Sequence, residues 1–415
     1  MTTQDYQKAL GRKIAAERRR RGLSQPELAR MVDRSVAWVS QVERGVRKVD
    51  RMSVLDALAT ALEVPLAELA AEAPVVAAVT EEPPGASGLR LVLSGAYALR
   101  AMLDGRRTPA ISTLRTKVRK TWDLTHAGRY TELTDLLRSL IPDLETAARS
   151  VPEEQQAEVS ELLATTYHAC SAALAKLGEP DAAWIAADRA MAAAERAGNP
   201  MLVAAGAFRL VFVFINARRY DQAEETARTA AEALWPTADQ DDPQAMSLWG
   251  GLTLQRAVIA AHVNDPDTAY GQLERASQIA DRLGGGHNEY NTEFGPANAR
   301  LYEIAVAVEL GDAGRALRAA ANLDSSGLSA ERQARMLIDV ARAHAQRRQI
   351  TEAVAALRQA EDITPEQVRG HELVRQLVSD LLTMQDPPSE ELRELAARVG
   401  AAKLQADIFS TVNIL

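Results

Sequence analysis

The sequence predicts an all-α protein, and two observations support that class. Apolar residues recur at i, i+3, i+4 and i+7 through most of the 415 residues, and almost no segment alternates with period two. Aromatic residues make up only 4% of the chain while hydrophobic residues make up 47%, a composition that suits alanine-rich helices better than β-sandwiches. We therefore expect packed helices rather than disorder or a pure coiled coil.

The first 70 residues predict a unit of five short helices, the first three of which are expected at 5–21, 25–32 and 36–44. Ser24 with Glu27 three residues later forms a capping-box pattern at the start of the second helix. Ser35 is placed to start the third helix in the same way. Two helices joined by so short a turn predict a helix-turn-helix.

The inner faces of these helices predict a small apolar core. Ala29 is small where the second helix approaches the third, and the β-branched Val39 and Val42 lie at the facing positions. The rest of this inner side is expected to consist of Leu28, Met31 and Val32. At the turn, the usual glycine is replaced by Asp33, a residue that tolerates left-handed backbone geometry better than most.

Charge is distributed unevenly along the chain. Residues 1–51 hold 13 Lys and Arg against 6 Asp and Glu, a charge of +7, whereas the whole chain carries −8 and the remaining residues therefore −15. A basic head on an acidic body predicts a polyanionic partner for the head alone. One cysteine, no signal-peptide profile and no apolar segment of membrane-spanning length predict a cytoplasmic protein without membrane contact.

Three segments together carry a specific resemblance: Gly22–Ala29, Ser35–Gly45 and Ser53–Leu62. Over about residues 8–69 they resemble the XRE family of phage-repressor-type DNA-binding domains. The resemblance implies that Gln25 meets a phosphate and braces the recognition helix, and that Arg18 and Glu43 form a structural ion pair. It also implies that the groove-facing residues are Val36, Ala37, Ser40 and Gln41.

Few side chains of the expected recognition helix can read bases. Gln41 can bond adenine bidentately and Ser40 can donate or accept, whereas valine and alanine offer only apolar contact. Trp38 either stacks on a sugar at the groove edge or packs on a neighbouring helix. Phosphate contacts are expected from Arg34, Arg44, Arg47, Lys48 and Arg51. The predicted partner is double-stranded DNA, bound by Ser24, Gln25, Arg34, Ser35, Val36, Ala37, Trp38, Ser40, Gln41, Arg44, Arg47 and Lys48. A helix-turn-helix used only for protein contact is the alternative.

Residues 71–88, with three prolines and two glycines, predict an interdomain linker. Beyond it, short turn signals 37 to 50 residues apart begin at Gly128, Gly178, Arg218, Asn264, Gly311 and Arg348. Each lies between two helical stretches, which resembles tetratricopeptide repeats, and stacked helix pairs predict a solenoid with one concave face. A generic helical bundle is the alternative. The expected domains are 1–70, a helical-repeat domain at 89–402 and an apolar tail at 403–415.

No catalytic or metal-binding pattern is found in the body, so we expect no enzyme, no cofactor and no metal. Counting back from the turn signals places mainly apolar side chains and a few amides on the concave face, which fits a peptide or small apolar ligand. The candidate ligand residues are His168, Phe208, Phe212, Asn216, Trp249, Arg256, Asn298 and Tyr302, and ordinary interhelix core is the alternative for the aromatic ones. The loop Gly284–Pro296 either closes over this groove or is merely a long connection.

The domain order resembles bacterial regulators that join a repressor-type head to tetratricopeptide repeats, some of which respond to signalling peptides. This resemblance implies a DNA-binding transcriptional regulator. We expect a homodimer on a palindromic operator, because one such head buries a small interface. The body would dimerise and sense an effector, either a peptide or a small molecule. The alternative is a protein-interaction scaffold whose repeats hold a protein partner, with DNA contact secondary.

Overall fold

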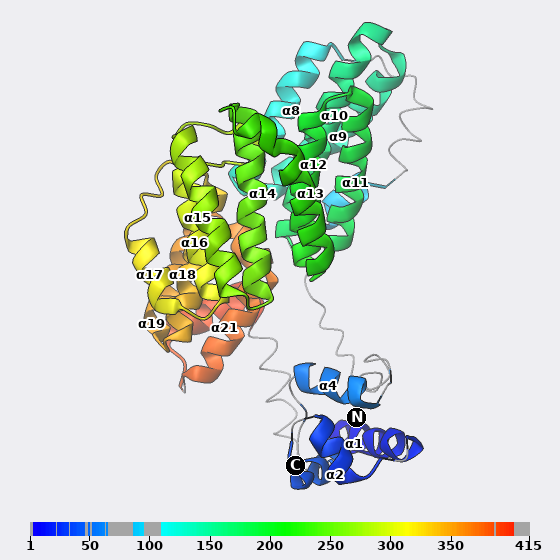
Figure 1. The fold of residues 1–415 in the computed structure, drawn as a ribbon, viewed down its shortest axis with the longest axis vertical. Coiled ribbons are helices and arrows are strands. Elements are labelled where there is room, and N and C mark those ends of the chain that lie inside the picture. Colours follow the sequence, from blue (N-terminus) through cyan, green and yellow to red (C-terminus); the bar gives the residue numbers. More distant parts are fainter. Residues whose placement is uncertain are drawn as a thin grey trace. The chain divides into compact units, whose positions relative to one another are not determined.

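The computed structural model describes residues 3–21, 23–32, 34–45, 49, 52–62, 64, 86–94, 109–385 and 387–401. The elements among these residues are helices, with no strand, which confirms the all-α class. They belong to two compact units, one within residues 1–80 and one within residues 81–405. Figure 1 shows the helices of each unit, and each unit has hydrophobic clusters of its own.

The described part of the first unit consists of α1 (Thr3–Arg20), α2 (Gln25–Met31), α3 (Val36–Glu43) and α4 (Met52–Leu62). The capping box predicted for α2 is present: the Glu27 backbone N–H donates to Ser24 Oγ at 3.3 Å, and the Ser24 N–H donates to Glu27 Oε2 at 2.7 Å. At the start of α3, the Trp38 N–H donates to Ser35 Oγ at 3.1 Å. These two caps fix where both helices of the motif begin. The expected fifth helix falls after residue 64, outside the described residues.

The core of this unit contains most of the predicted residues. The buried side chains are Leu10, Ile14, Leu28, Ala29, Val32, Val39, Val42, Leu58 and Leu62. The prediction for Met31 is wrong, because its side chain is 51% exposed. At about 100° per residue, position 31 lies outside the arc that contains positions 28, 29 and 32. Helix α1 crosses α3 at Gly11, where an added Cβ would lie 2.3 Å from the Val42 carbonyl oxygen.

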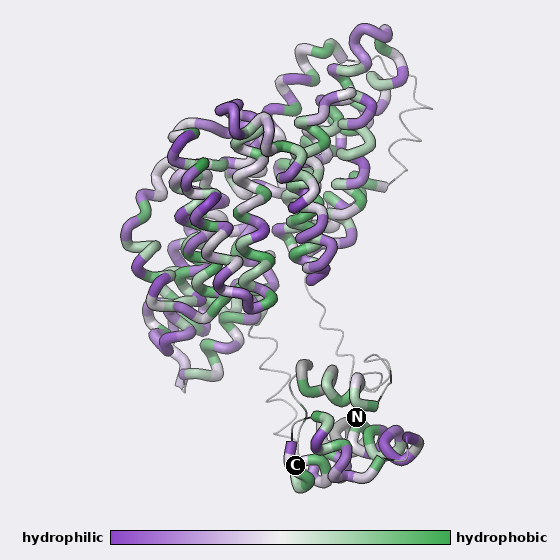
Figure 2. Tube along the Cα trace, viewed as in Figure 1, coloured by the Kyte–Doolittle hydropathy of each residue, from purple (hydrophilic) through white to green (hydrophobic). Residues whose placement is uncertain are grey.

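The second unit is built mainly from antiparallel helix pairs. Its elements are α6 (Ala86–Val92), α8 (Ile111–His126), α9 (Tyr130–Ser150), α10 (Glu153–Lys176), α11 (Pro180–Ala197), α12 (Pro200–Asn216), α13 (Tyr220–Ala238), α14 (Pro243–His262), α15 (Pro266–Leu283), η1 (Glu289–Asn291), α16 (Pro296–Glu309), α17 (Ala313–Ala321), α18 (Ala330–Gln346), α19 (Ile350–Ile363), α20 (Pro365–Gly370), α21 (Glu372–Met384) and α22 (Glu390–Arg398). Figure 2 shows hydrophilic and hydrophobic residues interleaved along these helices, as expected when one face of each is buried.

The six predicted turn signals all adopt one local structure. Each begins with a residue in the left-handed region, with φ between 56° and 78°, directly after the first helix of a pair. The next residue donates its N–H to the carbonyl oxygen five positions earlier, as Arg219 does to Phe214 at 2.8 Å. This is the Schellman arrangement, and it ends the helix and reverses the chain. Three of the six positions are not glycine: Arg218, Asn264 and Arg348.

The helix pairs stack through their first members. Helices α8, α10, α12, α14, α16 and α18 each contact the next in that series, and most second helices pack against the first helix that follows. The array also closes on itself, because α8 contacts α18 and the Thr131 N–H donates to Glu366 Oε2 at 2.9 Å across 235 residues. The predicted stack of helix pairs is therefore present, and its first helices surround an interior.

The predicted boundaries have different outcomes. Helix α6 begins at Ala86, so the last three residues of the range expected as a linker are helical. Residues 71–85 of that range and the tail at 403–415 lie outside the described residues. Among the described helices, none combines the length and hydropathy that a membrane span requires.

Candidate nucleic-acid interface and central cavity

Helix α3 presents its outer face to solvent. Ser35, Val36 and Ala37 are exposed, and Val36 retains 43% of its accessible surface. Ser40 and Gln41 are half-buried, and their side chains make no hydrogen bond with other described residues. The hydroxyl and the amide predicted to read bases are thus available to a partner.

The end of α3 is held by a buried polar cluster. Arg18 Nε donates to Glu43 Oε1 at 2.5 Å and Arg18 Nη2 donates to Glu43 Oε2 at 3.0 Å. Gln25 Nε2 donates to the same Oε2 at 2.7 Å. Burial raises the pKa of Glu43, but the hydrogen bonds from Arg18 and Gln25 outweigh it and the pKa is lowered. The predicted ion pair exists, and Gln25 links the first helix of the motif to the second.

The remaining predicted DNA contacts surround this helix. Trp38 packs against the apolar core, and its ring centroid lies 5.9 Å from the Arg34 guanidinium carbon. This supports the alternative in which Trp38 packs on a neighbouring helix. Arg34 and Arg44 are exposed. Arg44 Nε donates to the Ser40 carbonyl oxygen at 3.2 Å, and Ser24 belongs to the capping box. Arg47, Lys48 and Arg51 lie outside the described residues.

The second unit has a small cavity in its interior, about 30 Å³ in volume. Its lining consists of Ser171, Ala172, Lys176, Phe208, Arg209, Phe212, Gln255, Tyr302, Arg332 and Arg335. Three predicted ligand residues, Phe208, Phe212 and Tyr302, meet here from α12 and α16. We call this space the central cavity.

The other predicted ligand residues do not line the central cavity. His168, Trp249 and Asn298 are buried in the helix packing, and Trp249 lies 4.9 Å from Trp235 between ring centroids. Burial, with a smaller contribution from the Arg209 charge, lowers the pKa of His168 to about 3, so its imidazole is neutral.

Two further residues point elsewhere. Asn216 is exposed and donates to the Ala175 carbonyl oxygen at 3.1 Å, and Arg256 donates from Nε to Glu224 at 2.8 Å.

The expectation of a mainly apolar lining is wrong, because four of the ten lining residues are cations: Lys176, Arg209, Arg332 and Arg335. Arg332 and Arg335 lie in a polar helical stretch of the sequence, where nothing distinguishes them from solvent-facing arginines. Arg209 does carry a signal, since it interrupts the apolar stretch Leu202–Ala217. A lone charge in such a stretch indicates a buried polar contact.

The loop between α15 and α16 packs into the same interior. Arg209 Nη2 donates to the carbonyl oxygens of Tyr290 and Asn291 at 2.9 and 2.8 Å. Phe294 is buried against Gly250, where an added Cβ would lie 2.0 Å from its ring. The loop is therefore an ordered part of the interior and more than a long connection.

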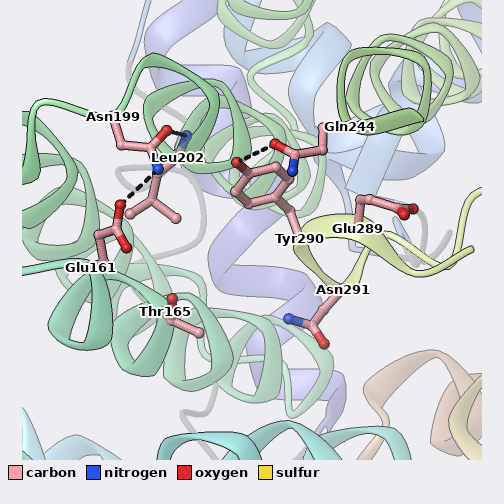
Figure 3. A pocket seen from close by; sticks show the side chains of 8 residues that line it. All are labelled: Glu161, Thr165, Asn199, Leu202, Gln244, Glu289, Tyr290 and Asn291. Carbon is pink, nitrogen blue, oxygen red and sulfur yellow. Dashed lines mark hydrogen bonds between the residues drawn. The ribbon is translucent and has the colours of Figure 1, made fainter. Parts of the chain in front are cut away.

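A larger pocket lies between this loop and the helices, with a volume of about 320 Å³. Figure 3 shows its lining from α10, the starts of α12 and α14, and η1: Glu161, Thr165, Asn199, Leu202, Gln244, Glu289, Tyr290 and Asn291. The Tyr290 hydroxyl donates to Gln244 Oε1 at 3.0 Å, and Asn199 Nδ2 donates to Glu161 Oε1 at 2.9 Å (Figure 3). This pocket is acidic and amide-rich, in contrast to the central cavity.

Comparison with known proteins identifies the first unit. Residues 9–71 match the family model described as a helix-turn-helix domain. No curated protein matches the chain. Among solved structures, the chain is similar to PlcR of Bacillus thuringiensis, crystallised in complex with the peptide PapR7 and DNA. The identity is 14%, the alignment covers 67% of this chain and 95% of that chain, and the TM-score is 0.29.

The chain therefore carries an N-terminal helix-turn-helix domain followed by a body of stacked helix pairs. Such domains are binding modules, so the chain is a DNA-binding regulator rather than an enzyme.

Proposed function

We propose that the protein is a sequence-specific transcriptional regulator that binds a palindromic operator as a homodimer and responds to an effector bound in its helical body. The observation that carries the proposal is the contrast between the outer face of α3 and its C-terminal end. Its outer face leaves Gln41 and Ser40 without partners among the described residues, and its end is fixed to α1 and α2 through Glu43. A rigidly held helix with free polar groups is what base reading in the major groove requires.

The residues of this face divide into two roles. Gln41 and Ser40 read base edges, and Val36 and Ala37 offer apolar contact to a thymine methyl. Arg34 and Arg44, both exposed, contact phosphates and set the register on the duplex. A role for Arg47 and Lys48 as further phosphate contacts is part of the same proposal.

Footprinting on genomic fragments, followed by affinity measurements at several salt concentrations, tests these roles. Gln41→Ala is expected to cost about 1–3 kcal/mol and to relax preference at one base pair of each half-site. Arg44→Ala is expected to weaken binding to all sequences and to reduce the salt slope by about 1. Arg358→Ala, an exposed arginine of the body, is the control. Unchanged sequence preference in the Gln41 variant would contradict the assignment.

The homodimer is proposed because a single head of this size offers few base contacts. Two heads on half-sites roughly 34–36 Å apart supply the affinity that one lacks. Inserting about 5 base pairs between the half-sites rotates them by half a helical turn, and we expect this to abolish cooperative binding. Equal affinity for the two spacings would show that the heads bind independently.

The effector role rests on the central cavity. It lies among the first helices of several pairs, so a molecule bound there changes how those pairs pack. The effector would then bias the spacing of the two heads of the dimer. Native mass spectrometry of the purified chain, combined with operator affinity before and after ligand removal, tests this step. A retained ligand whose removal leaves operator affinity unchanged would contradict it.

A further inference from the structure

The central cavity holds more positive than negative charge. Of its four cations, Lys176 pairs with Glu331 at 2.7 Å, and Arg332 pairs with Glu293 at 3.3 Å and lies 3.7 Å from Glu331. Glu331 and Glu293 therefore form their ion pairs with Lys176 and Arg332. Among the described residues, no carboxylate lies within ion-pair distance of the other two cations, Arg209 and Arg335.

Arg335 is the more accessible of these two cations. Its guanidinium carbon lies 5.8 Å from the Phe212 ring centroid and 5.6 Å from that of Tyr302. The side chain is half-buried and forms no hydrogen bond or ion pair with a described residue. Because its guanidinium donors have no described partner, they are available to a ligand.

Arg209 contributes a second unpaired group. Its Nη2 donates to the loop carbonyls, but its buried Nε has no hydrogen-bond partner. Burial and the neighbouring Arg332 charge lower the pKa of Arg209 to about 9. Burying a cation whose donors are not all satisfied is costly, and an anion in the cavity would lower that cost.

We propose that the central cavity binds the carboxylate head group of an organic acid, paired with Arg335 and Arg209. A volume of about 30 Å³ exceeds the roughly 10–15 Å³ that one water molecule needs, so the cavity accommodates one small head group. A carboxylate fits this limit better than a phosphate, which has more oxygens. The apolar part of the acid lies against Phe208 and Phe212. Binding itself does not depend on the function proposed above, whereas its effect on DNA does.

Matched carboxylate and carboxamide pairs test the head group. Thermal unfolding of the full chain is followed with formate and formamide, and with acetate and acetamide, at fixed ionic strength. We expect each carboxylate to raise the unfolding midpoint of the body above that seen with its amide. Equal midpoints within both pairs would overturn the proposal, because the amides match the acids in shape and lack the charge.

The variant Arg335→Met keeps the aliphatic stem over the aromatic rings and removes the charge. Its affinity for the carboxylates is expected to fall about tenfold or more, and Arg335→Lys should retain part of it. Arg358→Met is the exposed control and should bind like the original chain. An unliganded midpoint of Arg335→Met close to the original shows that the variant folds. Unchanged carboxylate affinity in that folded variant would overturn the assignment.

A separate measurement of operator affinity distinguishes this site from the proposed function. A carboxylate that binds and shifts operator affinity supports both. Carboxylate binding without such a shift upholds the site and contradicts its regulatory role. Failure of carboxylate binding with specific operator binding intact overturns the site alone.

Discussion

The ion pair between Arg18 and Glu43 gives the sharpest test of how the DNA-binding unit is held together. The two side chains retain only 10% and 6% of their accessible surface. Glu43→Ala leaves the Arg18 guanidinium without its carboxylate and removes the acceptor of Gln25 Nε2. Removing one partner of a buried pair costs about 3–5 kcal/mol.

That loss is large for a unit of this size. A single core in fewer than about 70–80 residues rarely supplies more than roughly 3–5 kcal/mol. Glu43→Ala should therefore unfold much of the unit at 25 °C, and operator binding should fall with it. The double variant Arg18→Met with Glu43→Leu should be more stable than Glu43→Ala, because no charge stays buried without a partner.

Hydrogen exchange measured by mass spectrometry on the whole chain separates the two units. In Glu43→Ala, amides within residues 3–62 should lose protection while those within 109–401 keep it. Glu27→Gln alters an exposed carboxylate of the capping box and serves as the control within the same unit. Protection of residues 3–62 equal to that of the original chain in Glu43→Ala would refute the reasoning.

Four further predictions concern the body. Burial raises the pKa of Glu331, but the neighbouring Lys and Arg charges outweigh this effect and lower the pKa to about 2. The Glu331 charge therefore stabilises the folded state above its unfolded-state pKa of about 4.3, and this contribution is lost as the pH falls toward 2. Urea unfolding of Glu331→Gln should therefore show a weaker dependence on pH across that window. Gly250→Ala places a methyl group in the Phe294 ring, so proteolysis of the loop at 284–295 should become faster; an unchanged cleavage rate would argue against this packing. Burial raises the pKa of Cys170 to about 12, and alkylation at about pH 8 should be slow until urea unfolds the body. Arg348 has a left-handed backbone with φ 59°, which glycine adopts readily and a β-branched residue does not. In thermal unfolding, Arg348→Gly should therefore be at least as stable as the original chain, and Arg348→Val should be less stable by about 1 kcal/mol.

The sequence predicted the features that depend on neighbours a few positions apart. The caps at Ser24 and Ser35 and the six turns of the body follow from hydrogen bonds that span at most five residues. A periodic apolar pattern likewise identified most of the core of the first unit. Met31 was wrongly placed in the core, because periodicity shows which way the buried face of a helix points but not how many positions that face includes.

The candidate DNA-binding residues were found largely through a motif whose geometry is local. The sequence could not show that Gln25 donates to Glu43 while Gln41 and Ser40 remain without described partners. That difference arises from how three helices cross, and Gly11 sets how closely two of them approach.

The central cavity was decided by the tertiary structure alone. Its lining runs from Ser171 to Arg335, and the register of each turn does not show how far the stack rotates from one pair to the next. The rotations of successive helix pairs add up until α8 contacts α18. The loop between α15 and α16 and the four cations therefore lie in an interior, where the sequence had predicted an apolar groove. The sequence by itself therefore determined the helices, their caps and the motif, because those depend on short-range hydrogen bonds and periodicity. Only the folded stack determined which charges lose their contact with water, because burial is a property of the whole array.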